Sequence, residues 1–187
     1  MRARRLALGL LLAAIAGCAT PSILQESRPE PALVLEEYFA GTTYAYGVFE
    51  SRGRIAERFS MRMEGRPVPG GFTLYERFRH PDGFTWARTW TFRPRGGGVY
   101  DGTAETVVGT GRIEVLGDSI RIRFTADQPL RRGSIRLGFD QRLTRLEDDV
   151  VINRSTVSKF GVPFGRITMT FVKSGSTHSA AGTIPAA

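Results

Sequence analysis

Residues 71–93 read GFTLYERFRHPDGFTWARTWTFR, and the spacing of apolar side chains in this segment indicates the fold class. On both sides of His80-Pro81-Asp82-Gly83, large apolar side chains alternate with polar ones. A period of two is typical of a β-strand with one dry and one wet face. Pro-Asp-Gly is a turn sequence, because proline and glycine supply the backbone angles that tight turns need. The stretch therefore predicts two antiparallel strands joined as a hairpin.

The same period of two continues on both sides of this hairpin. It is seen in residues 43–50, 54–63, 113–124, 135–143 and 167–171. We expect Tyr44, Tyr46 and Val48 to share the dry face of the first strand, and Ile55 to share that of the second with Phe59. Gly117-Asp118 is a further hairpin signal. The pattern predicts an all-β fold.

Such strands form either a sandwich or a barrel, and the tight, uniform joints favour an antiparallel up-and-down β-barrel of about 8–10 strands. Leu35, Tyr38 and Phe39 have helical spacing, and Gly41 follows as a stop signal. A short N-terminal helix before a strand with Gly41 and Tyr46 resembles the beginning of a lipocalin-like barrel. Barrels of this size hold one small ligand or a plug of side chains.

The first eighteen residues are typical of a lipoprotein signal. Arg2, Arg4 and Arg5 precede an apolar run, which ends in Ile15-Ala16-Gly17-Cys18. This ending resembles the bacterial lipobox, which implies lipidation of Cys18, the only cysteine. We expect a signal peptide at 1–17, a lipidated tether at 18–32, the barrel at 33–173 and a disordered tail at 174–187. Since Ala19 follows Cys18, the analogy with sorting signals implies anchoring in the outer membrane, facing the periplasm.

The charge does not indicate nucleic-acid binding. The chain has 26 basic and 18 acidic residues, a net charge of +8, but only Lys159 and Lys173 are lysines. The arginines are spread over many segments, as on the solvated faces of strands, without the clustered stripe expected of a nucleic-acid site.

Three charged residues interrupt the dry faces. Glu57, Glu76 and Arg88 are in phase with apolar neighbours, and the hairpin places Glu76 opposite Arg88 or one step away. Since a buried carboxylate needs a partner, one interpretation is an interior ion pair that fixes strand register. A second is a ligand site in which Arg88 holds a polar head. Its walls would be Trp86, Trp90, Phe59, Phe72 and Phe92. A third is acid–base chemistry by Glu57 and Glu76.

A second polar run lies near the C-terminus. It comprises Asp148, Asp149, Asn153, Arg154 and Lys159, and we expect it to connect two strands. Asp149 is a candidate acceptor for Arg154 or Lys159. The run is either a hydrogen-bonded corner or a functional loop.

Several motifs resemble a known family. They are Leu35-Glu36-Glu37-Tyr38-Phe39-Ala40-Gly41, Tyr46-Gly47-Val48-Phe49, Tyr100-x-Gly-x-Ala with Val107-Val108-Gly109, 148-DDVVINR-154, and Ser158-Lys159-Phe160-Gly161 with Gly165. Together they are similar to the bacterial lipoproteins of domain of unknown function 3833, over roughly residues 33–173. The family has no assigned catalytic residue, and the resemblance implies work on envelope lipids.

No catalytic motif is recognisable, because His80 lies in a predicted turn and His178 in the tail, and no cofactor or metal motif is present. We therefore predict a non-enzymatic protein that binds a fatty acid or lipid. The alternative is an envelope scaffold with a packed core. A third hypothesis is an enzyme that uses Asp148, Asn153 and Lys159.

Overall fold

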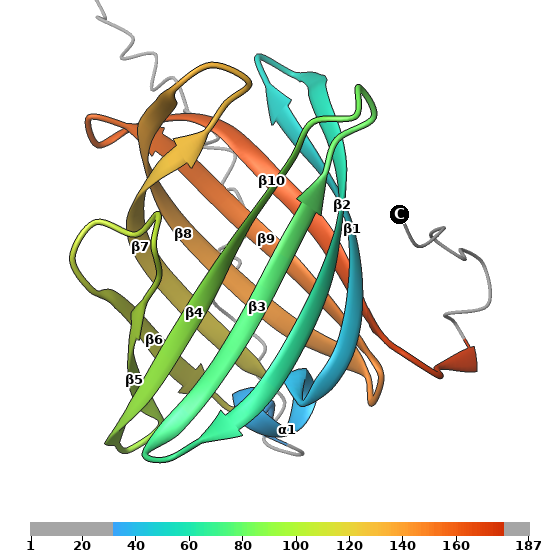
Figure 1. Cartoon of the computed structure of the whole chain (residues 1–187), viewed down its shortest axis with the longest axis vertical. Helices are drawn as coiled ribbons and strands as arrows, with labels where there is room; N and C mark the ends of the chain where they lie inside the picture. The colour runs from blue at the N-terminus through green and yellow to red at the C-terminus, as the bar shows by residue number, and fades with distance from the viewer. Residues whose placement is uncertain (1–31, 178–187) are drawn as a thin grey trace, which may run out of the picture.

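The computed structural model describes residues 32–177. The predicted signal peptide, Cys18, nearly all of the tether and most of the predicted tail lie outside these residues. Within them the chain forms one helix and ten strands (Figure 1). These are α1 (Leu35–Phe39), β1 (Gly41–Ser51), β2 (Arg54–Val68), β3 (Gly71–Arg79), β4 (Thr85–Gly96), β5 (Val99–Thr103), β6 (Gly111–Leu116), β7 (Ser119–Pro129), β8 (Ser134–Glu147), β9 (Val150–Lys159) and β10 (Val162–Lys173). The described helix is too short to cross a membrane.

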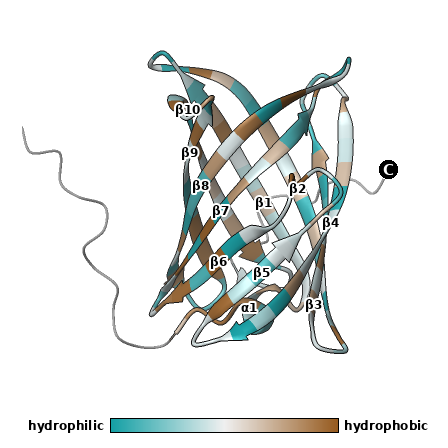
Figure 2. Ribbon diagram, turned by 90° about the vertical axis from the view of Figure 1, so that its left-hand side faces the viewer, coloured by the Kyte–Doolittle hydropathy of each residue, from teal (hydrophilic) through white to brown (hydrophobic). Residues whose placement is uncertain are grey.

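The strands follow one another around a closed antiparallel barrel, and β1 pairs with β10 to complete it. This confirms the predicted up-and-down barrel with a short N-terminal helix. Hydrophobic and hydrophilic residues alternate along the strands, as the bands in Figure 2 show. Full closure leaves no strand edge at the seam between β1 and β10, so the first and last strands stabilise each other.

Helix α1 plugs one end of the barrel (Figure 1). Leu35, Tyr38 and Phe39 are buried there, and the Tyr38 hydroxyl donates to the Phe171 carbonyl at 3.0 Å. Burial raises the pKa of Tyr38 above its ordinary value. Phe39 packs directly on Gly65, where a Cβ atom would lie 2.0 Å from the Phe39 carbonyl oxygen. The plug therefore needs a glycine at this point of the wall.

The opposite end carries the turns at residues 51–54, 80–84, 130–133 and 160–161, which we call the mouth (Figure 1). On one side the wall is incomplete, because β5 and β6 are short and residues 85–90 of β4 pair with β3 alone. Residues 104–110 fill this interruption. Val108 donates its backbone N–H to Thr125, and the N–H of Thr89 donates to the Glu105 carboxylate at 2.7 Å.

For parts of β1 and β2, the sequence pattern predicted the wrong inward face. Tyr46 is exposed and Ala45 is buried, so the tyrosines of β1 point outward. The inward face of β1 carries small residues because its neighbours fill the space: a Cβ at Gly47 would lie 2.5 Å from Met169. Ile55 is also exposed, because the register between β1 and β2 shifts at the next residue, Ala56, and this turns Ile55 to the outside.

Candidate ligand-binding site

A cavity of about 260 Å³ occupies the half of the barrel nearer the mouth. Its wall is mainly apolar and aromatic, with a few polar groups. The side chains that line it include Phe49, Glu57, Phe59, Met61, Glu76, Phe78, His80, Trp86, Arg88, Phe124, Gln128, Leu130, Ile135, Leu137, Phe139, Gln141, Val157, Phe164, Ile167, Met169 and Phe171. An apolar hollow with a few placed polar groups is the usual form of a small-molecule site.

The register of β3 and β4 creates the polar part of this wall. Glu76 lies directly opposite Arg88, which confirms the pairing predicted from the hairpin. Phe78 lies opposite Trp86, and their rings stack with centroids 3.8 Å apart. Because side chains alternate along both strands, the Phe78–Trp86 pair flanks the ion pair on one side of the inward face and the Leu74–Trp90 pair flanks it on the other.

The ion pair forms the floor of the cavity. The Nε of Arg88 donates to Oε2 of Glu76 at 2.6 Å, and Trp90 Nε1 donates to the same oxygen at 3.3 Å. Both charged side chains are more than nine-tenths buried. The Arg88 guanidinium lies 5.0–5.6 Å from the centroids of four rings, those of Phe78, Trp86, Trp90 and Phe124. Cation–π attraction therefore adds to the ion pair in holding Arg88.

Below this floor the barrel is nearly filled. A second cavity of only about 30 Å³ lies toward α1, between Leu35, Phe39 and the floor. Trp90 lines this lower cavity and not the upper one, and Phe92 does the same. Of the aromatic wall predicted from the sequence, Phe59 and Trp86 line the upper cavity.

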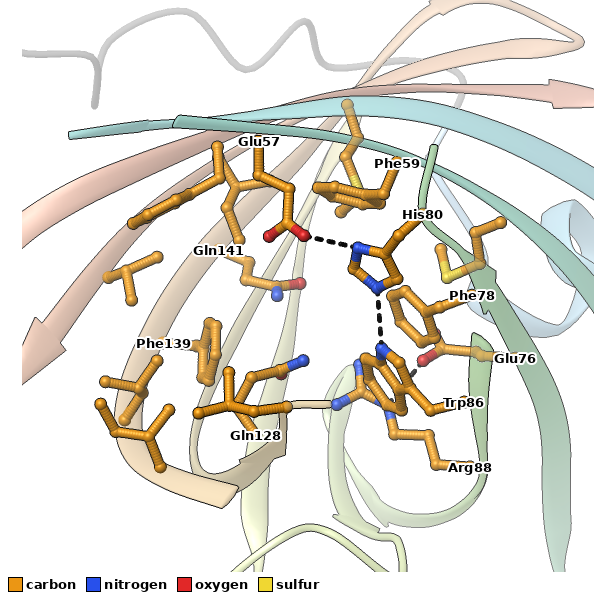
Figure 3. Close-up of a pocket in the computed structure, with 18 of the residues that line it drawn as sticks. Glu57, Phe59, Glu76, Phe78, His80, Trp86, Arg88, Gln128, Phe139 and Gln141 are labelled. Carbon is orange, nitrogen blue, oxygen red and sulfur yellow. Dashed lines mark hydrogen bonds and ion pairs between the residues drawn. The ribbon is translucent and has the colours of Figure 1, made fainter. Parts of the chain in front are cut away.

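His80 organises the upper part of the site (Figure 3). Its Nδ1 lies 2.6 Å from Oε1 of Glu57, and Trp86 Nε1 lies 3.2 Å from its Nε2. An indole N–H can only donate, so Nε2 of His80 must accept from Trp86. The imidazole proton is therefore on Nδ1, which donates to the Glu57 carboxylate. His80 is buried, while the Glu57 side chain remains 49% exposed. Glu57 thus faces the cavity as predicted, but its partner is a histidine.

His80 is a cavity residue that the alternating pattern does not predict, because its position in the sequence is that of a turn. The backbone of His80 does belong to the turn, since its N–H donates to the Phe84 carbonyl. Its side chain nevertheless continues the inward series of Glu76 and Phe78 by one more step of two. Extending the alternation past the end of the strand would have found it. On the opposite wall, Gln128, Phe139 and Gln141 face this group (Figure 3).

The polar run at residues 148–159 is not one site. The prediction of a connection between two strands holds only for Asp148 and Asp149, which form the turn between β8 and β9. It was wrong for Asn153, Arg154 and Lys159, which belong to β9 itself. Asp148 and Asp149 lie at the plugged end of β9, and Lys159 lies at the mouth. Arg154 points outward, while Asn153 is fully buried and accepts from the Ser155 hydroxyl at 3.3 Å. Asn153 and Ser155 on the inward face of β9 are polar, so the strand lacks the apolar alternation and its sequence is typical of a loop.

The described residues offer little for metal chemistry. Between residues 32 and 177, no three His, Cys, Asp or Glu side chains are grouped so that they could hold a metal ion. Glu57 and Glu76 are each held by a different partner, His80 and Arg88. The arrangement is suited to hold a molecule in an apolar hollow between two polar groups.

Comparisons with known proteins agree with the barrel. The fold is similar to the S-type phycobiliprotein lyase CPES from Guillardia theta, at 8% identity over 75% of this chain and 90% of that one, with a TM-score of 0.56. It is also similar to Rv2717c from M. tuberculosis, at 15% identity over 73% and 93% of the two chains, with a TM-score of 0.50. At these identities the likeness shows the fold alone.

No functionally curated protein matches this sequence significantly. The profile of one family, described as a protein of unknown function (DUF3833), matches residues 12–173. This match confirms the resemblance seen in the motifs, and the chain belongs to the DUF3833 family.

Proposed function

We propose that this protein is a non-enzymatic binding protein that holds one fatty acid or other acyl lipid in the upper cavity. The observation that supports this is the uneven filling of the barrel. A packed lower half and a hollow apolar upper half meet at the Glu76–Arg88 floor. A scaffold acting only through its surface would have no use for the hollow, which costs packing energy.

The acyl chain would lie between the apolar walls, among Phe59, Phe139 and Ile167. Its polar end would meet the floor. Among the described residues, Nε is the one guanidinium nitrogen of Arg88 that makes a hydrogen bond. The terminal nitrogens are therefore open to a carbonyl or carboxyl oxygen of the ligand, and the nearby Gln141 amide is a second donor.

The proposal includes an anchor at Cys18 and an outer-membrane location facing the periplasm. The support is the sequence of the lipobox-like segment. Two or more acyl chains on the mature N-terminus would hold the protein firmly on a membrane. Mass spectrometry of the N-terminal peptide from the full chain tests this directly. An unmodified Cys18 in a membrane-extracted preparation would overturn the anchor but leave the ligand proposal intact.

Native mass spectrometry with lipid extraction, on residues 19–187 made in a bacterial host, tests the ligand. We expect a stoichiometric acyl lipid. Val157→Phe, which fills the cavity, should abolish binding. Thr156→Phe is the matched control, because it adds the same ring on the exposed side of the same strand. A bare mass, with no uptake of added palmitate, would overturn the proposal in favour of a surface-acting scaffold.

A further inference from the structure

Exposed apolar side chains gather along one arc of the mouth. Three turns contribute to the arc: β1–β2, β9–β10 and β7–β8, whose strands are neighbours in the barrel. We call these side chains the apolar rim: Ile55, Leu130, Phe160, Val162 and Phe164. At the plugged end, by contrast, only two large apolar side chains of the described residues are exposed, those of Leu116 and Leu146. A concentrated apolar patch on one end of a molecule marks an interaction surface.

All the charged residues in the same three turns are basic. Residues 51–54, 130–133 and 159–162 contain five cations and no acidic residue. They are Arg52, Arg54, Arg131, Arg132 and Lys159. Arg131 pairs with Asp82 of the β3–β4 turn, and the Lys159 ammonium lies 5.4 Å from the Phe160 ring centroid. The other four cations have no carboxylate partner among the described residues. Apolar side chains beside four unpaired cations complement a surface that is negatively charged at its headgroups and apolar beneath them.

Phe160 is the most exposed member of the apolar rim. Its side chain is 94% exposed, and its φ of 53° places it in the left-handed region. Gly161 follows at φ 79°, which gives the two-residue turn that hairpins favour. Asparagine or glycine suits the first of these positions, whereas a bulky residue there is strained. The chain thus keeps a strained turn that projects an aromatic ring into solvent.

The apolar rim is continuous with the cavity. Leu130 and Phe164 are partly exposed, yet both also line the cavity wall. Phe164 packs edge-to-face on Phe49, another lining residue, with ring centroids 5.9 Å apart. An acyl chain could therefore pass from the rim to the cavity without leaving apolar surface.

We propose that this arc docks on the surface of an anionic phospholipid bilayer. Phe160 and Val162 reach the boundary between headgroups and acyl chains, and the four cations without an acidic partner (Arg52, Arg54, Arg132 and Lys159) lie among the phosphates. An aromatic ring beside lysine and arginine is the usual composition of an interfacial anchor. The docking itself stands on the rim, whereas its use, loading an acyl ligand through the mouth, rests on the proposed function.

Vesicle co-sedimentation of residues 19–187 tests the docking. The helix, all described strands and the buried core lie within residues 33–173, so residues 19–187 contain the whole described barrel. We expect sedimentation with vesicles of phosphatidylcholine and phosphatidylglycerol, weakening as salt is added, and little with phosphatidylcholine alone. Equal binding to both kinds of vesicle, or binding to neither, would overturn the proposal; the second result would point to an acidic protein partner.

Two variants test which residues dock. Phe160→Asn removes the ring but suits the left-handed backbone, and we expect it to weaken vesicle binding about tenfold. Arg132→Gln with Lys159→Gln should also weaken it about tenfold or more. The matched control is Arg66→Gln with Arg95→Gln, which removes two charges near the plugged end and should have no effect. An equal loss in the control would show a general charge effect and overturn the assignment to the mouth.

A Phe160→Trp variant reports where the turn lies. Its indole emission should shift to the blue on anionic vesicles, and an unchanged spectrum with sedimenting protein would place the contact elsewhere. Palmitate uptake from solution separates the two proposals. If Phe160→Asn loses vesicle binding but keeps uptake, docking is distinct from ligand binding, as we expect. If the unchanged chain docks on anionic vesicles but takes up no palmitate, the proposed function fails while the docking stands.

Discussion

Glu76 on β3 and Arg88 on β4 face each other inside the barrel, with Nε of the guanidinium 2.6 Å from the carboxylate oxygen. Two opposite charges in an apolar interior stabilise each other, but each has lost its hydration. The pair therefore contributes more to position than to net stability. It fixes the β3–β4 register and sets the depth at which the hollow half of the barrel ends.

Breaking this pair should be much worse than removing it. Arg88→Met leaves an unpartnered buried carboxylate, so we expect a loss of about 3–5 kcal/mol in the free energy of unfolding. Glu76→Leu combined with Arg88→Met leaves no buried charge and should cost clearly less than either single change. Urea denaturation followed by circular dichroism measures all three. Additive losses in the double variant would show that the two side chains do not act as a pair.

His80 should matter more for stability than its exposed partner. His80→Phe keeps an aromatic ring but leaves Trp86 Nε1 without an acceptor, and we expect a cost of about 1–3 kcal/mol. Glu57→Gln keeps an oxygen that can accept from Nδ1 of His80, so it should cost less than about 1 kcal/mol. Denaturation of the two variants side by side gives the comparison. Equal costs would mean that the Trp86–His80 hydrogen bond contributes nothing.

The Asp82–Arg131 ion pair joins two turns of the mouth across the incomplete part of the wall. Nε of Arg131 lies 2.6 Å from the Asp82 carboxylate, and Nη2 lies 2.6 Å from the Asp82 carbonyl. Arg131→Gln should leave stability unchanged, because the pair is exposed, but should speed the release of a fluorescent fatty acid roughly two- to fivefold. Arg136→Gln, which breaks the exposed pair with Asp127 on adjacent strands, is the control.

The same pair predicts a pH dependence. The hydrogen bond from Arg131, with that from the Phe84 N–H, holds the pKa of Asp82 below its ordinary value of 3.8. The folded-state pKa is depressed, so the pair is present above pH 3.8 and is lost as the pH falls through the lower value. Release from the unchanged chain should be constant down to about pH 4 and faster below it. If Arg131→Gln shows the same acid response, another group is responsible.

Tyr100 ties the plug to the wall, since its hydroxyl donates to the Glu36 carboxylate at 3.0 Å. Burial, with the hydrogen bond and charge of Glu36, raises the pKa of Tyr100 to about 12. A raised folded-state pKa means that this stabilisation is complete below about pH 10 and lost as the pH approaches about 12. Tyr100→Phe should cost about 1 kcal/mol at pH 8. Its unfolding free energy should also fall less steeply than that of the unchanged chain in alkali.

Much of the fold follows from local pattern. Residues 71–93 predict not only a hairpin but also the Glu76–Arg88 pairing, because strand alternation and a tight turn together fix the register. The failures have equally local causes. The inward face of β1 holds the small residues Ala45 and Gly47, so the larger outward residues Tyr44 and Tyr46 have the alternation expected of a buried face. On β9, Asn153 and Ser155 point inward, and because they are polar the sequence does not show the apolar alternation of a strand.

The hollow itself could not be predicted. Inward side chains such as Phe59, Leu137 and Met169 look the same in the sequence whether they meet at the barrel centre or leave a space. That outcome depends on how ten strands set the width, which is a property of the closed sheet. His80 was missed for a different reason, because a turn backbone does not say where its side chain points.

The plug at α1 makes the barrel a blind tube. If the protein binds the proposed ligand, the ligand would enter and leave at the mouth, because α1 closes the other end. The described chain begins at the plugged end, where the Ala32 carbonyl accepts from Arg145. The chain that leads to the proposed anchor at Cys18 therefore joins the barrel at the end opposite the mouth. If both proposals hold, the protein would be tethered from one end of the barrel and would exchange its ligand at the other.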